Sequence, residues 1–66
     1  MSANNYLNIT KKDNRFYVQE KDMDTGSVFK VSEFNKDGYT SLEEAIKVAN
    51  DYMKYEEVEG GLDIDI

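Results

Sequence analysis

The 66-residue chain contains no cysteine, histidine, tryptophan or proline. Without cysteine, no disulfide can supplement a small core and thiol chemistry is excluded. Without histidine, the chain lacks the commonest general base and the commonest transition-metal ligand. No apolar run approaches the roughly 20 residues that span a bilayer, and the first residues do not show the pattern of a signal peptide. We therefore expect a single-domain (1–66) cytoplasmic protein, not membrane-bound, which is not an enzyme and needs no cofactor.

Basic residues are also scarce, and their scarcity is uneven along the chain. There are 8 Lys and Arg against 14 Asp and Glu, which gives a net charge of −6. From residue 37 onward, nine acids face only two lysines. A negative field repels phosphate backbones and anionic lipids, and it favours a basic surface on another protein. The acidic second half is therefore the first place to look for a partner-binding surface.

Three stretches alternate apolar and polar residues with a period of two, which predicts β-strands at about 5–10, 15–21 and 27–34. The polar turn at 11–14 and the Gly26-containing turn at 22–26 connect them, so we expect an antiparallel meander. Its buried face should carry six apolar side chains: Leu7, Ile9, Phe16, Val18, Phe29 and Val31. Such a face needs a cover, because a lone three-stranded sheet leaves it exposed to water.

The cover is a predicted helix at about 41–57. Thr40-x-x-Glu43 is a capping-box pattern, and Ser41-x-x-Glu44 is a competing register for the same helix start. Leu42, Ala45, Ile46, Ala49 and Met53 form one apolar stripe at helical spacing, flanked by Val48, Tyr52 and Tyr55. The fold class is therefore α+β, with the order β-β-β-α and a further strand discussed next.

The segment GGLDIDI at 60–66 alternates large aliphatic residues with aspartates. We expect residues 62–66 to form a short strand, because three large aliphatic side chains are hard to leave exposed in so small a domain. Docking beside the first strand of the same chain and pairing with another chain or copy both remain open. The expected order is thus β-β-β-α-β.

The leading functional hypothesis is a small acidic protein-interaction module, a regulator or inhibitor of the kind carried by phages and mobile elements. Its acidic helix and tail would bind a basic surface on another protein. The candidate partner-binding residues are Glu43, Glu44, Asp51, Glu56, Glu57, Glu59, Asp63 and Asp65.

A second hypothesis is nucleic-acid binding through the outer face of the sheet. Aromatic and cationic side chains interleaved on a sheet can stack single-stranded bases. The residues concerned are Tyr6, Arg15, Tyr17, Lys21 and Lys30. A three-stranded sheet followed by one helix is expected from FYVQ, TG and VFKV and then TSLEEAIKVAN. This order of elements resembles that of the arm-type DNA-binding domains of phage integrases. That resemblance implies a three-stranded sheet that enters the major groove of DNA.

A third hypothesis concerns residues 33–44, EFNKDGYTSLEE, which resemble the calcium-binding loop of EF-hand proteins. The resemblance implies Glu33, Asn35, Asp37, Tyr39 and Glu44 as oxygen ligands, with Gly38 at the sharp turn. The alternative is a strand-to-helix loop with a glycine turn and a capped helix, and we favour that reading, with no metal, because short motifs often match by chance.

Overall fold

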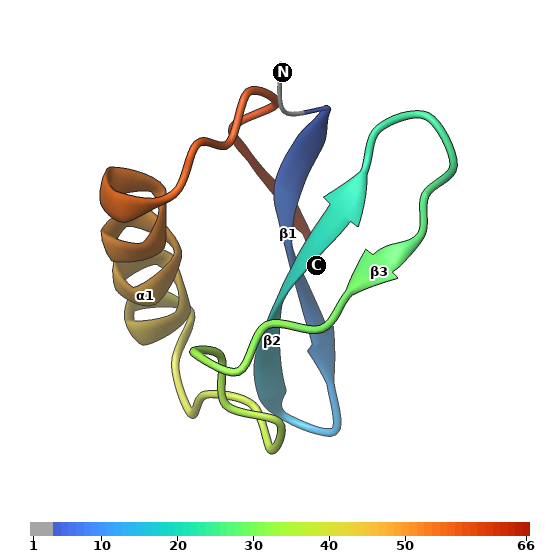
Figure 1. The fold of residues 1–66 in the computed structure, drawn as a ribbon. Helices are drawn as coiled ribbons and strands as arrows, with labels where there is room; N and C mark the ends of the chain where they lie inside the picture. Colours follow the sequence, from blue (N-terminus) through green and yellow to red (C-terminus); the bar gives the residue numbers. More distant parts are fainter. Residues whose placement is uncertain (1–3) are drawn as a thin grey trace.

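The structure is a computed structural model that describes residues 4–66, and it has the expected α+β fold (Figure 1). The elements are β1 (Asn5–Lys12), β2 (Arg15–Asp22), β3 (Val28–Phe29), α1 (Leu42–Tyr55) and β4 (Leu62–Asp65). They form one four-stranded sheet in the order β3-β2-β1-β4, with α1 packed across one of its faces. No helix in residues 4–66 is long and apolar enough to cross a membrane.

The β1–β2 hairpin follows directly from its turn residues. Asp13 and Asn14 both have positive φ angles, of 53° and 64°. Positive φ at both central residues belongs to the type I′ turn, whose twist matches that of the flanking strands, and Asn and Asp tolerate it better than most residues. The resulting register places Ile9 opposite Val18 and Leu7 opposite Glu20. All four side chains therefore lie on one face of the sheet, the face under α1.

The third strand is much shorter than the predicted 27–34. β3 pairs only at Glu20–Phe29 and Lys21–Val28. Continued in this register, Glu33 would lie opposite Phe16, but Tyr39 already occupies that edge of β2. The main-chain N–H of Phe16 donates to the Tyr39 carbonyl at 2.8 Å, and the N–H of Tyr39 donates back at 2.7 Å. The chain therefore leaves the sheet after Phe29 and returns only at Tyr39.

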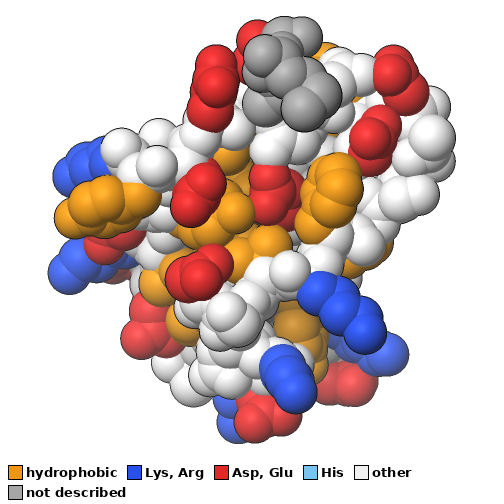
Figure 2. Space-filling view, viewed as in Figure 1, with side chains coloured by type: hydrophobic (Ala, Val, Ile, Leu, Met, Phe, Trp, Pro, Cys, Tyr) orange, Lys and Arg blue, Asp and Glu red, His pale blue; other side chains and the backbone are white. Residues whose placement is uncertain are grey.

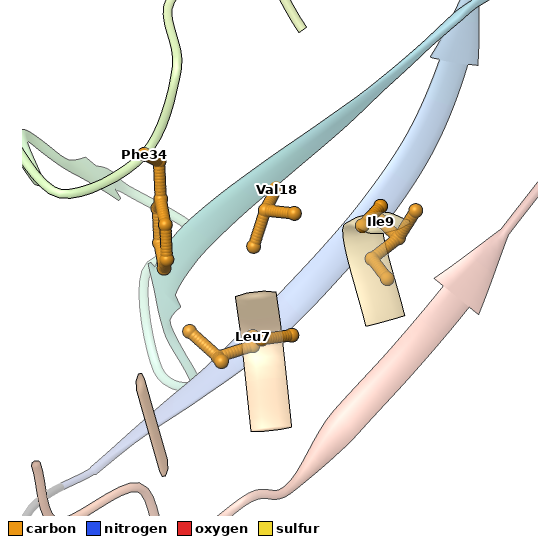
Figure 3. Packing of buried hydrophobic residues seen from close by; sticks show 6 residues of the cluster. Leu7, Ile9, Val18 and Phe34 are labelled. Atoms are coloured by element: carbon orange, nitrogen blue, oxygen red, sulfur yellow. The ribbon is translucent and has the colours of Figure 1, made fainter. Parts of the chain in front are cut away.

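The core differs from the predicted one at the same place. Its buried members are Leu7, Ile9, Val18, Phe34, Ala45 and Ala49 (Figure 3). Phe16 and Val31 are only partly buried, and the prediction that Phe29 is buried is wrong, because its side chain is 44% exposed. Phe34 covers this end of the core instead, since the segment after β3 turns back under the helix. The two alanines of α1 are fully buried, and their small side chains permit a close approach between helix and sheet.

The helix begins one residue later and ends two residues earlier than predicted. Ser41 is its N-cap: the Ser41 hydroxyl accepts a hydrogen bond of 3.1 Å from the main-chain N–H of Glu44. Of the two possible registers, the one starting at Ser41 is therefore the one formed. Helix α1 ends at Tyr55, and the extended Glu56 closes it by donating its N–H to the Tyr52 carbonyl at 2.9 Å.

The C-terminal strand docks on its own chain. Residues 62–65 pair in parallel with β1, with Leu62 opposite Leu7 and Ile64 opposite Ile9. The sheet is therefore mixed rather than purely antiparallel. Gly60 makes this approach possible, because a Cβ at this position would lie 2.6 Å from the Tyr6 Cβ and 2.9 Å from the Asn5 carbonyl oxygen. Of the two expected arrangements, the structure shows docking beside the first strand of the same chain.

Candidate binding groove beside the helix

A buried polar network fixes the C-terminal half of α1 to the sheet. Glu20 lies on the helix-facing side of β2 and is only 9% exposed. The Tyr52 hydroxyl donates to one Glu20 carboxylate oxygen at 2.8 Å, and the Asn5 side-chain amide donates to the other. Both oxygens of a carboxylate removed from water thus have donors, which is the condition for burying such a group at an acceptable cost. Tyr52 is consequently held in one place and orientation.

The position of Tyr52 defines the floor of a groove between α1 and the segment that follows β3. The Phe34 ring packs against the Tyr52 ring, with centroids 4.9 Å apart and an interplanar angle of 52°. Val48 completes the floor, and Tyr55 stands beside it with 87% of its surface exposed. The groove has a volume of about 380 Å³. We call this feature, lined by Phe34, Val48, Tyr52 and Tyr55, the aromatic groove.

Three carboxylates form the rim of the aromatic groove: Glu33, Asp51 and Glu56. Asp51 has a long ion pair with Lys54 at 3.8 Å, the one ion pair within residues 4–66. Glu33 and Glu56 have no cation within the same distance among the described residues. Figure 2 shows the same arrangement at the surface, with hydrophobic side chains in the middle of this face and acidic ones set around them.

The titration of Tyr52 reflects these surroundings. Burial, the hydrogen bond to Glu20, and the negative charges of Glu20, Glu56 and Glu33 all raise the pKa of the Tyr52 hydroxyl well above its usual value. Two rim carboxylates therefore lie close enough to act on the phenol at the floor. The groove combines a negative potential with the exposed aromatic ring of Tyr55, and a cation gains from both.

The structure divides the predicted acidic surface into separate groups. Asp51 and Glu56 reach the rim of the groove. Glu43 and Glu44 lie in the first helical turn, at the other end of α1, where the helix dipole favours acids. Glu57 and Glu59 lie in the connection after the helix, and Asp63 and Asp65 lie on β4. The predicted residues are therefore spread over both ends of α1, the connection after it and β4.

Sequence reasoning missed Glu33 and Phe34 as members of the groove. The sequence pattern places Glu33 in a calcium loop, and a strand at 27–34 gives Phe34 no place beside the helix. Glu33 and Glu56 are separated by more than 20 positions, so only the packing of Phe34 on Tyr52 brings them to one groove. Tyr52 and Tyr55 flank the predicted apolar stripe of the helix. This position at the edge of the stripe is the one feature of the sequence that points to the groove.

The three carboxylates of the predicted calcium loop, Glu33, Asp37 and Glu44, do not form a metal-binding group. The part of the chain that the structure describes contains no group of three or more Asp or Glu side chains arranged to hold a metal ion. The Asn35 side chain caps its own turn, accepting the N–H of Asp37 at 3.0 Å, and Gly38 turns the chain with a φ of +83°. Tyr39 pairs with Phe16, and the main-chain N–H of Glu44 donates a hydrogen bond to the Ser41 hydroxyl. These contacts are those of a strand-to-helix loop with a capped helix.

The outer sheet face does collect most of the residues of the nucleic-acid hypothesis. Tyr6 lies opposite Lys21, and Arg15 and Tyr17 follow on the same face of β2. Lys30 lies beyond the end of β3 and is exposed. The same sheet face also carries Asp63 and Asp65 on β4, so it is not uniformly basic.

Comparisons with family models, with curated proteins and with solved structures gave no match to this chain. The resemblances to integrase arm-type domains and to the EF-hand loop therefore stay predictions. The function has to be argued from the geometry of the groove and of the sheet.

Proposed function

We propose that this chain is a non-enzymatic protein-interaction module that binds a basic surface on another protein. The aromatic groove would receive an arginine or lysine side chain of that partner. The observation that carries the proposal is the combination of three rim carboxylates with an aromatic floor in one groove of about 380 Å³.

The chemistry of the groove suits a long cationic side chain better than a neutral apolar one. The aliphatic stem of arginine or lysine can lie on Phe34 and Val48, while its charged end reaches Glu33 or Glu56. A guanidinium can also stack on the exposed Tyr55 ring and still donate to a carboxylate. The remaining acids of the chain add a negative field that speeds the encounter with a basic partner.

A titration with a short arginine peptide tests this proposal. Acetyl-Gly-Arg-Gly-amide is added to the full chain and followed by amide NMR, with the same peptide carrying glutamine in place of arginine as control. We expect the arginine peptide to shift signals of residues 33–34 and 48–56, and the glutamine peptide to leave them in place. Shifts confined to other regions would contradict the proposal.

A matched pair of variants separates the groove from the general charge. E33Q/E56Q removes two rim charges, and E43Q/E57Q removes two charges outside the rim. We expect the first variant to weaken arginine-peptide binding about tenfold, which corresponds to about 1.4 kcal/mol. The second should weaken it by less than about threefold, because distant exposed charges contribute little. Equal losses in the two variants would show that the groove has no special role.

Nucleic-acid binding by the outer sheet face is the second candidate, because the register places Tyr6 beside Lys21, with Tyr17 and Arg15 further along the same face. A gel shift with single-stranded and double-stranded DNA at low salt distinguishes it. Retention that weakens steeply with salt would support this candidate, and the absence of any retention would support the protein-binding proposal.

A further inference from the structure

Among residues 4–66, the second edge of β4 presents main-chain groups without a partner. β4 is the last strand of the sheet order, and within residues 4–66 no segment pairs with its second edge. The N–H of Leu7 donates to the Gly61 carbonyl at 2.9 Å, which fixes how the parallel ladder alternates. The main-chain groups of Gly61, Asp63 and Asp65 therefore face β1, and those of Leu62 and Ile64 face outward.

The side chains of β4 present a different chemistry on each face of the sheet. On the helix side, Ile64 remains 42% exposed, and Ile66 beyond the strand is 64% exposed. On the outer side, Asp63 and Asp65 are exposed and lie opposite Asn8 and Thr10 of β1. An incoming strand would therefore meet apolar side chains on one face and carboxylates on the other.

This arrangement selects against a second copy of the chain. Edge-to-edge pairing of two β4 strands would bring four aspartates together on one face, and like charges on neighbouring strands are destabilising. Each copy would also add a net charge of −6 to the complex. A strand with lysine or arginine at alternate positions is attracted instead, because its cations would lie beside Asp63 and Asp65.

We propose that the β4 edge is a strand-docking surface for a partner segment that alternates basic and apolar residues. The partner's main chain would bond to the outward groups of Leu62 and Ile64, and this would provide affinity without regard to sequence. Its basic residues would pair with Asp63 and Asp65, and its apolar residues would cover Ile64. The charge pattern provides the specificity by attracting the basic strand and repelling an acidic one.

This surface is separate from the aromatic groove. The groove is lined by residues of α1 and of the segment after β3, whereas β4 lies beyond β1 at the opposite end of the sheet order. The inference therefore does not depend on the proposed function of the groove, although both surfaces require a basic partner.

Hydrogen exchange of the β4 amides tests the inference. The probe is the peptide acetyl-KVKVKV-amide, with acetyl-EVEVEV-amide as its control, each added to the full chain at low salt. We expect the lysine peptide to slow exchange at the amides of Leu62 and Ile64 by about tenfold or more, because paired amides must open before they exchange. The amides of Asp63 and Asp65 already face β1 and should change little. Equal protection by the glutamate peptide, or no protection at Leu62 and Ile64, would overturn the inference.

Charge-matched variants complete the test. D63K/D65K and E57K/E59K change the net charge equally, and all four side chains are exposed. Read at the Leu62 and Ile64 amides, we expect the first variant to weaken lysine-peptide binding about tenfold and the second to weaken it far less. E33Q/E56Q changes only the groove and should leave the protection of the Leu62 and Ile64 amides by the lysine peptide unchanged, so a failure of the groove proposal is distinguishable from a failure here. Equal weakening by the two lysine variants, or a dimer of the free chain in sedimentation that D63K/D65K alters, would overturn the inference.

Discussion

The Tyr52 hydroxyl on α1 donates a hydrogen bond of 2.8 Å to the buried carboxylate of Glu20 on β2. This contact ties the helix to the sheet at the point where the aromatic groove begins. Tyr52 is therefore both a structural anchor and part of the groove floor. The stability of the fold and the shape of the groove depend on the same side chain.

Replacement of Tyr52 by phenylalanine removes this hydrogen bond and leaves one Glu20 oxygen without its donor. We expect Y52F to lower the free energy of unfolding by about 1.5–3 kcal/mol, the usual range for hydrogen bonds to charged groups. Urea denaturation followed by circular dichroism measures the loss. Y55F is the matched control, because Tyr55 is 87% exposed and should change stability by less than about 0.5 kcal/mol. Similar losses in the two variants would contradict this role of Tyr52.

Stability should fall at high pH because the pKa of Tyr52 is higher in the folded than in the unfolded chain. Below about pH 10, the ordinary pKa of tyrosine, the hydroxyl is protonated in both states and contributes no pH dependence. Above it, the unfolded state loses a proton that the folded state keeps, so the free energy of unfolding decreases as the pH rises. Denaturation midpoints between pH 9 and 11.5 measure the slope.

The control for the pH prediction is Y52F, because this variant lacks the group whose pKa is raised. Its midpoint should fall less between the same pH values than that of the parent chain. Absorbance at 295 nm should also show one of the five tyrosines ionising only as the chain unfolds. If stability falls equally steeply with pH in Y52F and in the parent chain, groups other than Tyr52 cause the loss of stability at high pH.

Alanine at Gly60 should destabilise the docking of β4. The added Cβ would lie 2.6 Å from the Tyr6 Cβ and 2.9 Å from the Asn5 carbonyl, and neither is the flexible end of a side chain. We expect a loss of about 1–3 kcal/mol, the typical cost of overpacking, with faster exchange of the β4 amides facing β1. G61N is the control, because Gly61 has a φ of +72° with open space around it and asparagine tolerates that conformation. An unchanged exchange pattern in G60A would contradict the close packing at Gly60.

The start of α1 provides a test of the capping register. S41A removes the hydroxyl that accepts the Glu44 N–H and should cost about 1 kcal/mol of stability. T40A should cost much less, because Thr40 precedes the N-cap. Thermal or urea denaturation of the two variants measures the difference. A larger loss in T40A than in S41A would show that the helix begins in the other register.

Local sequence signals predicted the parts of the fold that local physics determines. The Asp13-Asn14 turn, the alternation in β1 and β2, the helix stripe and the glycines before β4 all specify their elements within a few neighbouring residues. The length of β3 was not predictable in this way, because it depends on Tyr39 taking the edge of β2 at Phe16. That competition involves residues more than 20 positions apart.

The aromatic groove could not be predicted either, because it also forms through contacts between residues far apart in the sequence. Composition pointed to an acidic second half, and Asp51 and Glu56 were among the predicted residues. However, the third rim acid, Glu33, comes from the other side of the groove and meets them only because Phe34 folds under Tyr52. The sequence therefore indicated the sign of the charge but not the place where it surrounds an aromatic floor.

Intermolecular NOEs from the arginine peptide show whether the aromatic groove binds a cationic side chain. We predict NOEs between the arginine side-chain protons and the rings of Tyr52, Tyr55 and Phe34, with upfield shifts of those protons from the ring currents. NOEs to Tyr6 and Tyr17 instead would place the cation on the outer sheet face and would show that the groove does not bind it.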